Sequence, residues 1–109
     1  MLAERPRVHL WLDDERPAPT GWTHARSVAD AIVVMQAGPV EAVSLDHDLA
    51  DLDPDHPEHR ERTGYDLLLW MAEHDRWPRQ KPTVHSANPI GGASMRLFID
   101  RHWRAPDET

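Results

Sequence analysis

The sequence predicts a single α/β domain built on a short parallel sheet, and three observations support this prediction. Apolar runs rich in strand-forming residues recur at 7–12, 40–45 and 81–84. Segments with apolar residues at helical spacing lie between and after these runs. Each run ends directly in polar residues, as strands do where a parallel sheet builds a site at its carboxyl edge. Because crossovers between parallel strands are right-handed, we expect helices on the faces of the sheet.

Length, composition and charge narrow the class of protein. The 109 residues fall near the commonest domain size, so residues 1–109 are interpreted as one domain. The chain has no apolar run of transmembrane length, no signal peptide and no cysteine, so we expect a cytoplasmic protein without disulfides or a membrane partner. The formal net charge of −7 argues against binding to duplex nucleic acid. Attraction for a phosphate ligand must then come from local basic groups or a cation.

Turn and cap signals divide the first half of the chain. A breaker cluster at 17–21 ends the first strand, and residues 22–26 are predicted as a short second strand. Ser27, with Asp30 three residues later, resembles a capping box that starts a helix. Gly38 is expected to end this helix before the next strand begins.

The second half has similar signals. Residues 49–62 are predicted as a polar loop. A second capping-box pattern at Thr63 starts a helix that should end near 77–78. Asn88, with a proline at the first helical position, should cap a closing helix that runs to Trp103. The predicted order is strand, short strand, helix, strand, helix, strand, helix.

Carboxylates gather at two of the predicted strand ends. Asp13 and Asp14 follow the first strand, and Asp46 and Asp48 follow the strand at 40–45. We expect these carboxylates to lie close together, because the carboxyl ends of parallel strands lie at one edge of the sheet. At that distance they repel one another unless protons or a cation intervene. Mg²⁺ or Mn²⁺ is the expected cofactor, since both prefer carboxylate oxygens. The alternative is that these aspartates cap turns and helix ends in water.

Groups that suit a phosphate are predicted at the same edge. The planar guanidinium of Arg16 matches phosphate oxygens, although a salt bridge to a neighbouring acid is the alternative. Ser86 and Asn88 open the last helix, whose free N–H groups and dipole attract anions. Gly91 would let a ligand approach the backbone closely. For Asn88, the alternative is a helix cap and nothing more.

Two histidines complete the predicted site. His47 lies between two aspartates, and His85 follows the last strand. A neighbouring carboxylate favours the charged imidazole, so each histidine could act as a general acid near neutral pH. The alternatives are ligation of a transition metal, or ordinary hydrogen bonding and packing.

Several of these residues together resemble a response-regulator receiver domain. The matching positions are Asp13-Asp14, Asp46, Gly64 and Ser86-Ala87. In receivers the acids hold Mg²⁺, the middle aspartate accepts a phosphoryl group, and the serine or threonine contacts that group. This chain lacks the lysine of a further strand and the helix between the first two strands. A phospho-accepting receiver at Asp46 is therefore the least favoured of the functions considered.

The remaining motifs are more similar to the receiver-derived family of cyclic-phosphate-processing receiver domains. They are Asp13-Asp14-x-Arg16-Pro17, Leu45-Asp46-His47-Asp48-Leu49, Thr63-Gly64-x-Asp66 and His85-Ser86-x-Asn88-Pro89-x-Gly91. Ser94 stands where a second polar site residue is expected. The resemblance implies a minimal receiver-like, flavodoxin-like three-layer sandwich with about four strands in the order 2-1-3-4.

The resemblance also implies a function. The favoured one is a metal-assisted phosphoesterase acting on a cyclic phosphate, such as an RNA 2′,3′-cyclic end or a cyclic nucleotide. In this interpretation Asp13, Asp14, Asp46 and Asp48 hold the metal and His47 and His85 are catalytic, while the phosphate is bound by Arg16, Ser86, Asn88 and Gly91. The alternative is a sensor or sponge that binds the same phosphate compound or RNA end without cleaving it.

Overall fold

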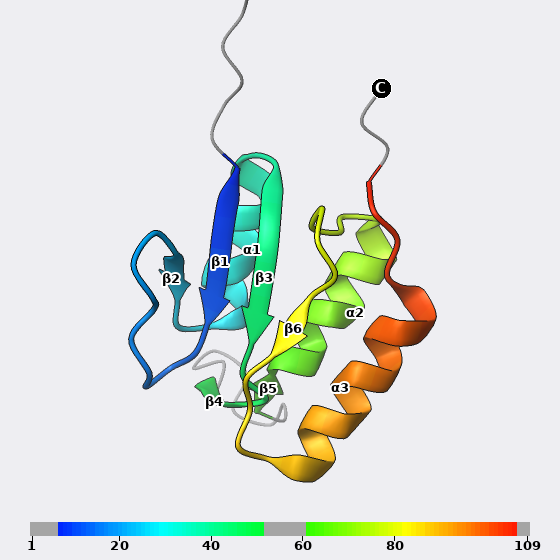
Figure 1. The fold of residues 1–109 in the computed structure, drawn as a ribbon. Coiled ribbons are helices and arrows are strands. Elements are labelled where there is room, and N and C mark those ends of the chain that lie inside the picture. Colours follow the sequence, from blue (N-terminus) through cyan, green and yellow to red (C-terminus); the bar gives the residue numbers. More distant parts are fainter. Residues whose placement is uncertain (1–6, 52–60, 107–109) are drawn as a thin grey trace, which may run out of the picture.

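The computed structural model describes residues 7–51 and 61–106, which form six strands and three helices (Figure 1). Their bounds are β1 Val8–Leu12, β2 Thr23–Ala25, α1 Val28–Ala37, β3 Val40–Leu45, β4 Asp48–Asp51, β5 Arg62–Thr63, α2 Gly64–His74, β6 Thr83–Val84 and α3 Pro89–His102. None of the helices in these ranges combines the length and apolar character that a transmembrane span requires.

The main sheet has four parallel strands in the order β2-β1-β3-β6. At its centre, Leu12 of β1 pairs with Leu45 of β3, and Leu45 pairs in turn with Val84 of β6. Because β6 is the fourth strand of this sheet in chain order, the predicted order 2-1-3-4 is confirmed. The receiver-like α/β fold is confirmed with it.

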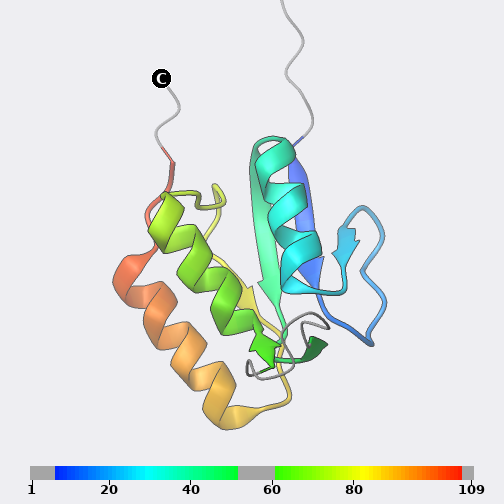
Figure 2. The same ribbon diagram turned by 180° about the vertical axis from the view of Figure 1, so that it is seen from behind.

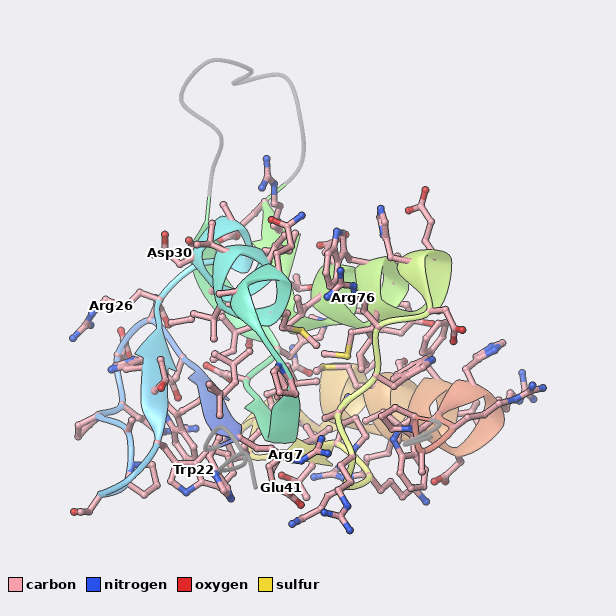
Figure 3. The ribbon with its side chains drawn as sticks, turned by 90° about the horizontal axis from the view of Figure 1, so that it is seen from above. Arg7, Trp22, Arg26, Asp30, Glu41 and Arg76 are labelled. Carbon is pink, nitrogen blue, oxygen red and sulfur yellow. The ribbon has the colours of Figure 1, made fainter. Side chains whose placement is uncertain are left out.

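One face of the sheet carries the core. Leu10, Leu12, Val43 and Leu45 are buried on this face, as the two-residue period of a strand requires. Helices α1 and α2 cover it (Figures 2 and 3), and α3 runs beside β6 and packs against α2. In the described residues the opposite face of β1 and β3 has no helix over it, since the connection at 13–22 forms none. These residues therefore supply one helical layer of the sandwich.

Aromatic rings cover the face that lacks helices. The ring of Trp11 stacks on His85, with the centroids 3.8 Å apart and the planes at 4°. Trp22, which Figure 3 shows on the side away from α1, meets Trp11 and His9 edge-on, with centroids 6.1 Å and 5.3 Å away. Ser44, which pairs with Trp11 in the sheet, is only 5% exposed. The rings thus bury polar backbone and side chains that a helix would otherwise cover. We call Trp11, Trp22, His9 and His85 the aromatic cover.

Side-chain caps fix the helix starts, as predicted. Ser27 accepts a hydrogen bond from the Asp30 N–H at the start of α1, and Thr63 forms a capping box with Asp66 at the start of α2. The predicted end of α2 near 77–78 is wrong. The helix ends at His74, because Asp75 adopts a left-handed conformation with φ of 51°, a cap that the sequence does not mark with glycine.

The predicted polar loop at 49–62 is wrong at both of its ends. There β4 pairs with β5 in a small antiparallel sheet, in which Asp48 pairs with Thr63. The two segments are too polar to show the alternation that predicts strands. The rest of that predicted loop, residues 52–60, lies outside the described residues.

Candidate functional site

Backbone hydrogen bonds bring three strand ends together. The Asp46 N–H donates to the carbonyl of Leu12 over 2.9 Å, and the His85 N–H donates to the carbonyl of Leu45 over 2.9 Å. The residues after β1, β3 and β6 are therefore adjacent at the carboxyl edge of the sheet, beyond the arrowheads of these strands in Figure 1. The predicted convergence of the three polar clusters is confirmed.

Three carboxylates at this edge could hold a metal ion. One oxygen from each of Asp13, Asp14 and Asp46 lies within 4.8 Å of the others. Asp13 is 1% and Asp46 8% exposed, so two of the three are almost fully withdrawn from water. An all-carboxylate set of this kind fits a hard divalent cation. Asp48 does not belong to this group and is bonded elsewhere.

Asp13 is held by the loop that follows it. Its Oδ1 accepts hydrogen bonds from the N–H groups of Glu15, over 2.8 Å, and Arg16, over 2.9 Å. Its Oδ2 lies 3.0 Å from Nε2 of His85. Burial raises the pKa of Asp13, but the hydrogen bonds from Arg16, Glu15 and His85 together outweigh burial and lower it. Asp13 is therefore a carboxylate fixed in its charged form.

The pKa of Asp46 is shifted in the opposite direction, above its ordinary value. Burial raises its pKa, and the charge of Asp13 raises it further. The hydrogen bond from the His47 N–H, over 2.9 Å, and the nearby positive groups offset this only in part. The negative charge of Asp46 is thus undercompensated by the protein, and a cation between the carboxylates would relieve this repulsion.

A second cluster joins the end of β3 to the start of α3. Nδ1 of His47 lies 2.9 Å from an oxygen of Asp48, and the Asn88 amide donates to both Asp48 oxygens over 3.3 Å. The hydrogen bond from His47, and to a smaller extent those from Asn88, lower the pKa of Asp48. The other end of the Asn88 amide accepts the N–H of Gly91 over 2.9 Å. Asn88 therefore caps the helix and also anchors Asp48, so the cap is only part of its role.

Two backbone N–H groups in the first turn of α3 bond to Asn88 at its start. Asn88 accepts both the Gly91 N–H, through its side chain, and the Gly92 N–H, through its carbonyl. Ser86 accepts the Asn88 N–H over 3.0 Å. Gly91 is buried against the ring of His47, which accounts for the glycine without a ligand at that position. Ser94 lies away from this turn, in a groove with Tyr65 and Phe98.

The side chain of His85 lies on the face of the sheet that carries the aromatic cover. Its Nε2 contacts Asp13, and its Nδ1 lies 2.7 Å from the hydroxyl of Ser44. Burial lowers the pKa of His85 more than Asp13 and Asp46 raise it. The charged imidazole expected from the neighbouring carboxylates is thus disfavoured at this residue. The backbone carbonyl of His85 accepts a hydrogen bond from Nη1 of Arg16 over 2.8 Å.

An open pocket of about 350 Å³ lies over the carboxylates. Neither His47 nor His85 lines it. The sequence did not predict Glu15 and Glu61 in the wall of the pocket, because a single glutamate in a polar segment does not by itself indicate a site. It also missed Ser44, although a polar residue in an otherwise apolar strand marked that position. The lining residues are Asp13, Asp14, Glu15, Arg16, Asp46, Asp48, Leu49, Glu61 and Ala87.

The chain matches one family of known domains. The sequence model of the cyclic-phosphate processing receiver domain matches residues 8–101, a range that runs from β1 almost to the end of α3. This range contains all of the residues that line the pocket. No curated protein and no solved structure matches the chain. By this match over most of its length, the chain belongs to the family of cyclic-phosphate processing receiver domains.

Proposed function

We propose that this domain is a metal-assisted phosphoesterase that opens a cyclic phosphate, such as an RNA 2′,3′-cyclic end or a cyclic nucleotide. The observation that carries the proposal is the group Asp13, Asp14 and Asp46, with oxygens within 4.8 Å, in a pocket that Arg16 also lines. Carboxylates that could hold a cation, beside a guanidinium, suit the singly charged phosphodiester of a cyclic phosphate. Family membership supports the choice of a cyclic phosphate.

The residues present fit a divalent cation, Mg²⁺ or Mn²⁺. Asp13, Asp14 and Asp46 would hold it, and the raised pKa of Asp46 marks where positive charge is needed. Asp48, the fourth predicted ligand, also lines the pocket, but it lies outside the group of three and is bonded to His47 and Asn88. When bound, such a cation neutralises phosphoryl oxygens and activates water.

Arg16 is the main phosphate-binding residue of this proposal. Nη1 donates to the His85 carbonyl, which fixes one edge of the guanidinium, and the side chain remains 48% exposed at the pocket. Its other N–H groups can bind two oxygens of one phosphate. The Ser86 hydroxyl, which accepts from Asn88, keeps a hydrogen to donate. Gly91 contributes through its packing on His47.

We assign the role of proton carrier to His47, which does not line the pocket itself but is bonded to Asp48 in its wall. Its Nδ1 is paired with Asp48, which orients the ring and leaves Nε2 for proton transfer. Water attacks phosphorus and loses a proton to the base, the P–O bond to one ester oxygen breaks, and that oxygen takes a proton. The product is a phosphomonoester with a free hydroxyl. His85, the other predicted catalytic histidine, has both ring nitrogens occupied by Asp13 and Ser44.

The test is incubation of the full chain with nucleoside 2′,3′-cyclic and 3′,5′-cyclic monophosphates, with Mg²⁺ or Mn²⁺ and with EDTA. We expect metal-dependent release of a nucleoside monophosphate, read by chromatography. His47→Ala should lower the rate by about 10²- to 10⁴-fold, the usual contribution of a general acid or base. His74→Ala, on the exposed end of α2, is the matched control and should retain the rate.

Two outcomes would contradict the proposal. One is an absence of turnover by the wild-type chain on every substrate, and the other is an unchanged rate in His47→Ala. If a cyclic nucleotide raises the melting temperature and is recovered intact, the domain is a binding module that does not cleave its ligand.

A further inference from the structure

We propose that His85 is a positioning residue that fixes the Asp13 carboxylate for the cation and the Arg16 guanidinium for the phosphate. The inference rests on the proposed function, because it assigns His85 a role in the same site. It differs from a role in proton transfer, since it requires His85 to touch protein groups and no substrate atom. Three sets of contacts support it.

The first set is the occupancy of the Asp13 oxygens. A carboxylate offers about four lone-pair directions, two on each oxygen. The Glu15 and Arg16 N–H groups take both directions on Oδ1, at 2.8 Å and 2.9 Å. His85 takes one direction on Oδ2, at 3.0 Å. The remaining direction on Oδ2 is the one left for a cation, and the imidazole N–H sets where it points.

The second set locks the ring of His85. Asp13 only accepts hydrogen bonds, so Nε2 carries the hydrogen, and in a neutral ring Nδ1 then accepts from the Ser44 hydroxyl over 2.7 Å. The flat face of the ring rests on Trp11 at 3.8 Å. Rotation of the ring would break two hydrogen bonds and the stack. A supporting partner of this kind typically changes metal affinity by roughly 10- to 100-fold when removed.

The third set links the two halves of the site. The His85 carbonyl accepts Nη1 of Arg16 over 2.8 Å, and the same Nη1 lies 3.8 Å from Oδ2 of Asp13. The indole N–H of Trp11 donates to the Arg16 carbonyl over 3.2 Å, which ties the loop back to the sheet. His85, the residue that follows β6, thus contacts Asp13 through its ring and Arg16 through its backbone carbonyl.

The test measures Mn²⁺ affinity by calorimetry on the full chain without any nucleotide. His85→Phe keeps a flat ring for Trp11 but loses the donor, and we expect roughly 10- to 100-fold weaker Mn²⁺ binding. His85→Gln, which can still donate an N–H, should recover part of the affinity. His9→Phe is the matched control on the same face, where His9 meets only the edge of Trp22 among the described ring contacts, and it should bind as the wild type does.

Separate outcomes decide the two proposals. A wild-type chain that binds no Mn²⁺ would overturn the proposed metal-assisted function and this inference with it. A wild type that binds, together with His85→Phe of equal affinity, would overturn the inference alone. If His85→Phe does not fold, Ser44→Ala decides, since it keeps the imidazole and removes one of the two hydrogen bonds that orient the ring. Unchanged affinity in Ser44→Ala would then overturn the inference, and weaker binding would support it.

Discussion

Gly91 packs directly on the imidazole of His47. A Cβ at this position would lie 2.5 Å from both Cγ and Cδ2 of the ring. The glycine stands in the first turn of α3, where it lowers helix propensity relative to alanine. Its presence is explained by the ring, which needs this space to reach Asp48.

Gly91→Ala should therefore act through His47. The added methyl group must displace the ring from Asp48, so we expect a large fall in kcat for cyclic-phosphate hydrolysis and a loss of about 1–3 kcal/mol in unfolding free energy. Gly92→Ala is the control, because its Cβ would meet the flexible end of Arg96 at 3.2 Å and Cγ1 of Val84 at an ordinary contact distance of 3.7 Å. That variant should keep kcat and gain up to about 1 kcal/mol from helix propensity. Equal kcat values in the two variants would argue against the role of His47.

Asp46→Asn should stabilise the metal-free protein. The pKa of Asp46 is raised on folding, so the folded state binds its proton more tightly than the unfolded chain does. The wild type accordingly loses stability as the pH rises through the interval between the unfolded and folded pKa values. Asparagine stays neutral, so its advantage should be full at pH 7 and shrink as the pH falls. Urea unfolding in EDTA at several pH values measures this.

Asp13→Asn should change the free energy of unfolding in the opposite direction, towards lower stability. The pKa of Asp13 is lowered on folding, so its charge stabilises the folded state, and this contribution is lost as the pH falls through the folded pKa. The variant should be less stable than the wild type at pH 7. We expect Mg²⁺ to raise the melting temperature of the wild type and of neither asparagine variant. The same sign of stability change in both variants would contradict the assigned charge states.

Arg16→Lys should weaken substrate binding while leaving the fold intact. Lysine keeps the charge but has no planar fork that can bond the His85 carbonyl and a phosphate together. A hydrogen bond to a charged group contributes about 1.5–3 kcal/mol, which corresponds to roughly 10- to 100-fold in kcat/KM. Steady-state kinetics on the preferred cyclic nucleotide, beside Arg96→Lys on the exposed side of α3, checks this. A kcat/KM within error of the wild type would exclude Arg16 from the phosphate site.

Gly64→Ala should destabilise the whole domain. A Cβ on Gly64 would overlap the backbone carbonyl of Asp46, which cannot move without shifting β3. We expect a loss of about 1–3 kcal/mol, as for other forced overpacking. Gly38→Ala is the control, since its Cβ would meet nothing within 4 Å and its φ of 173° suits any residue. Thermal unfolding followed by circular dichroism separates the two variants.

The sheet and the acid cluster could be predicted because each follows from a short-range rule. The alternation of Leu10 and Leu12 marks a strand, and the direction of parallel strands places Asp13 beside Asp46 whatever the details of packing. The roles of His47 and His85 depend on the direction in which each side chain points, which the sequence motifs do not specify. Val84 faces the core, so the next residue, His85, turns to the opposite face and meets Trp11.

Other features depend on contacts between segments that are distant in sequence, or on an unusual backbone conformation at one residue. The pairing of β4 with β5 joins polar segments that lack strand alternation, and only the folded chain brings them together. The end of α2 depends on one aspartate that adopts a left-handed conformation, which aspartate seldom does. The double use of Asn88, as cap and as anchor for Asp48, requires α3 to begin beside the end of β3.

The aromatic cover has a consequence for protein engineering. Substitutions on the outer surfaces of α1 and α2 can be used to tune solubility or expression, because Figure 3 shows these helices on the side of the sheet away from Trp22, which meets Trp11 edge-on. Redesign of the opposite face is a different matter, since the ring that shields Ser44 from water is also the ring that contacts Asp13. A graft of a new helix onto that face would have to rebuild the contacts of Asp13 as well.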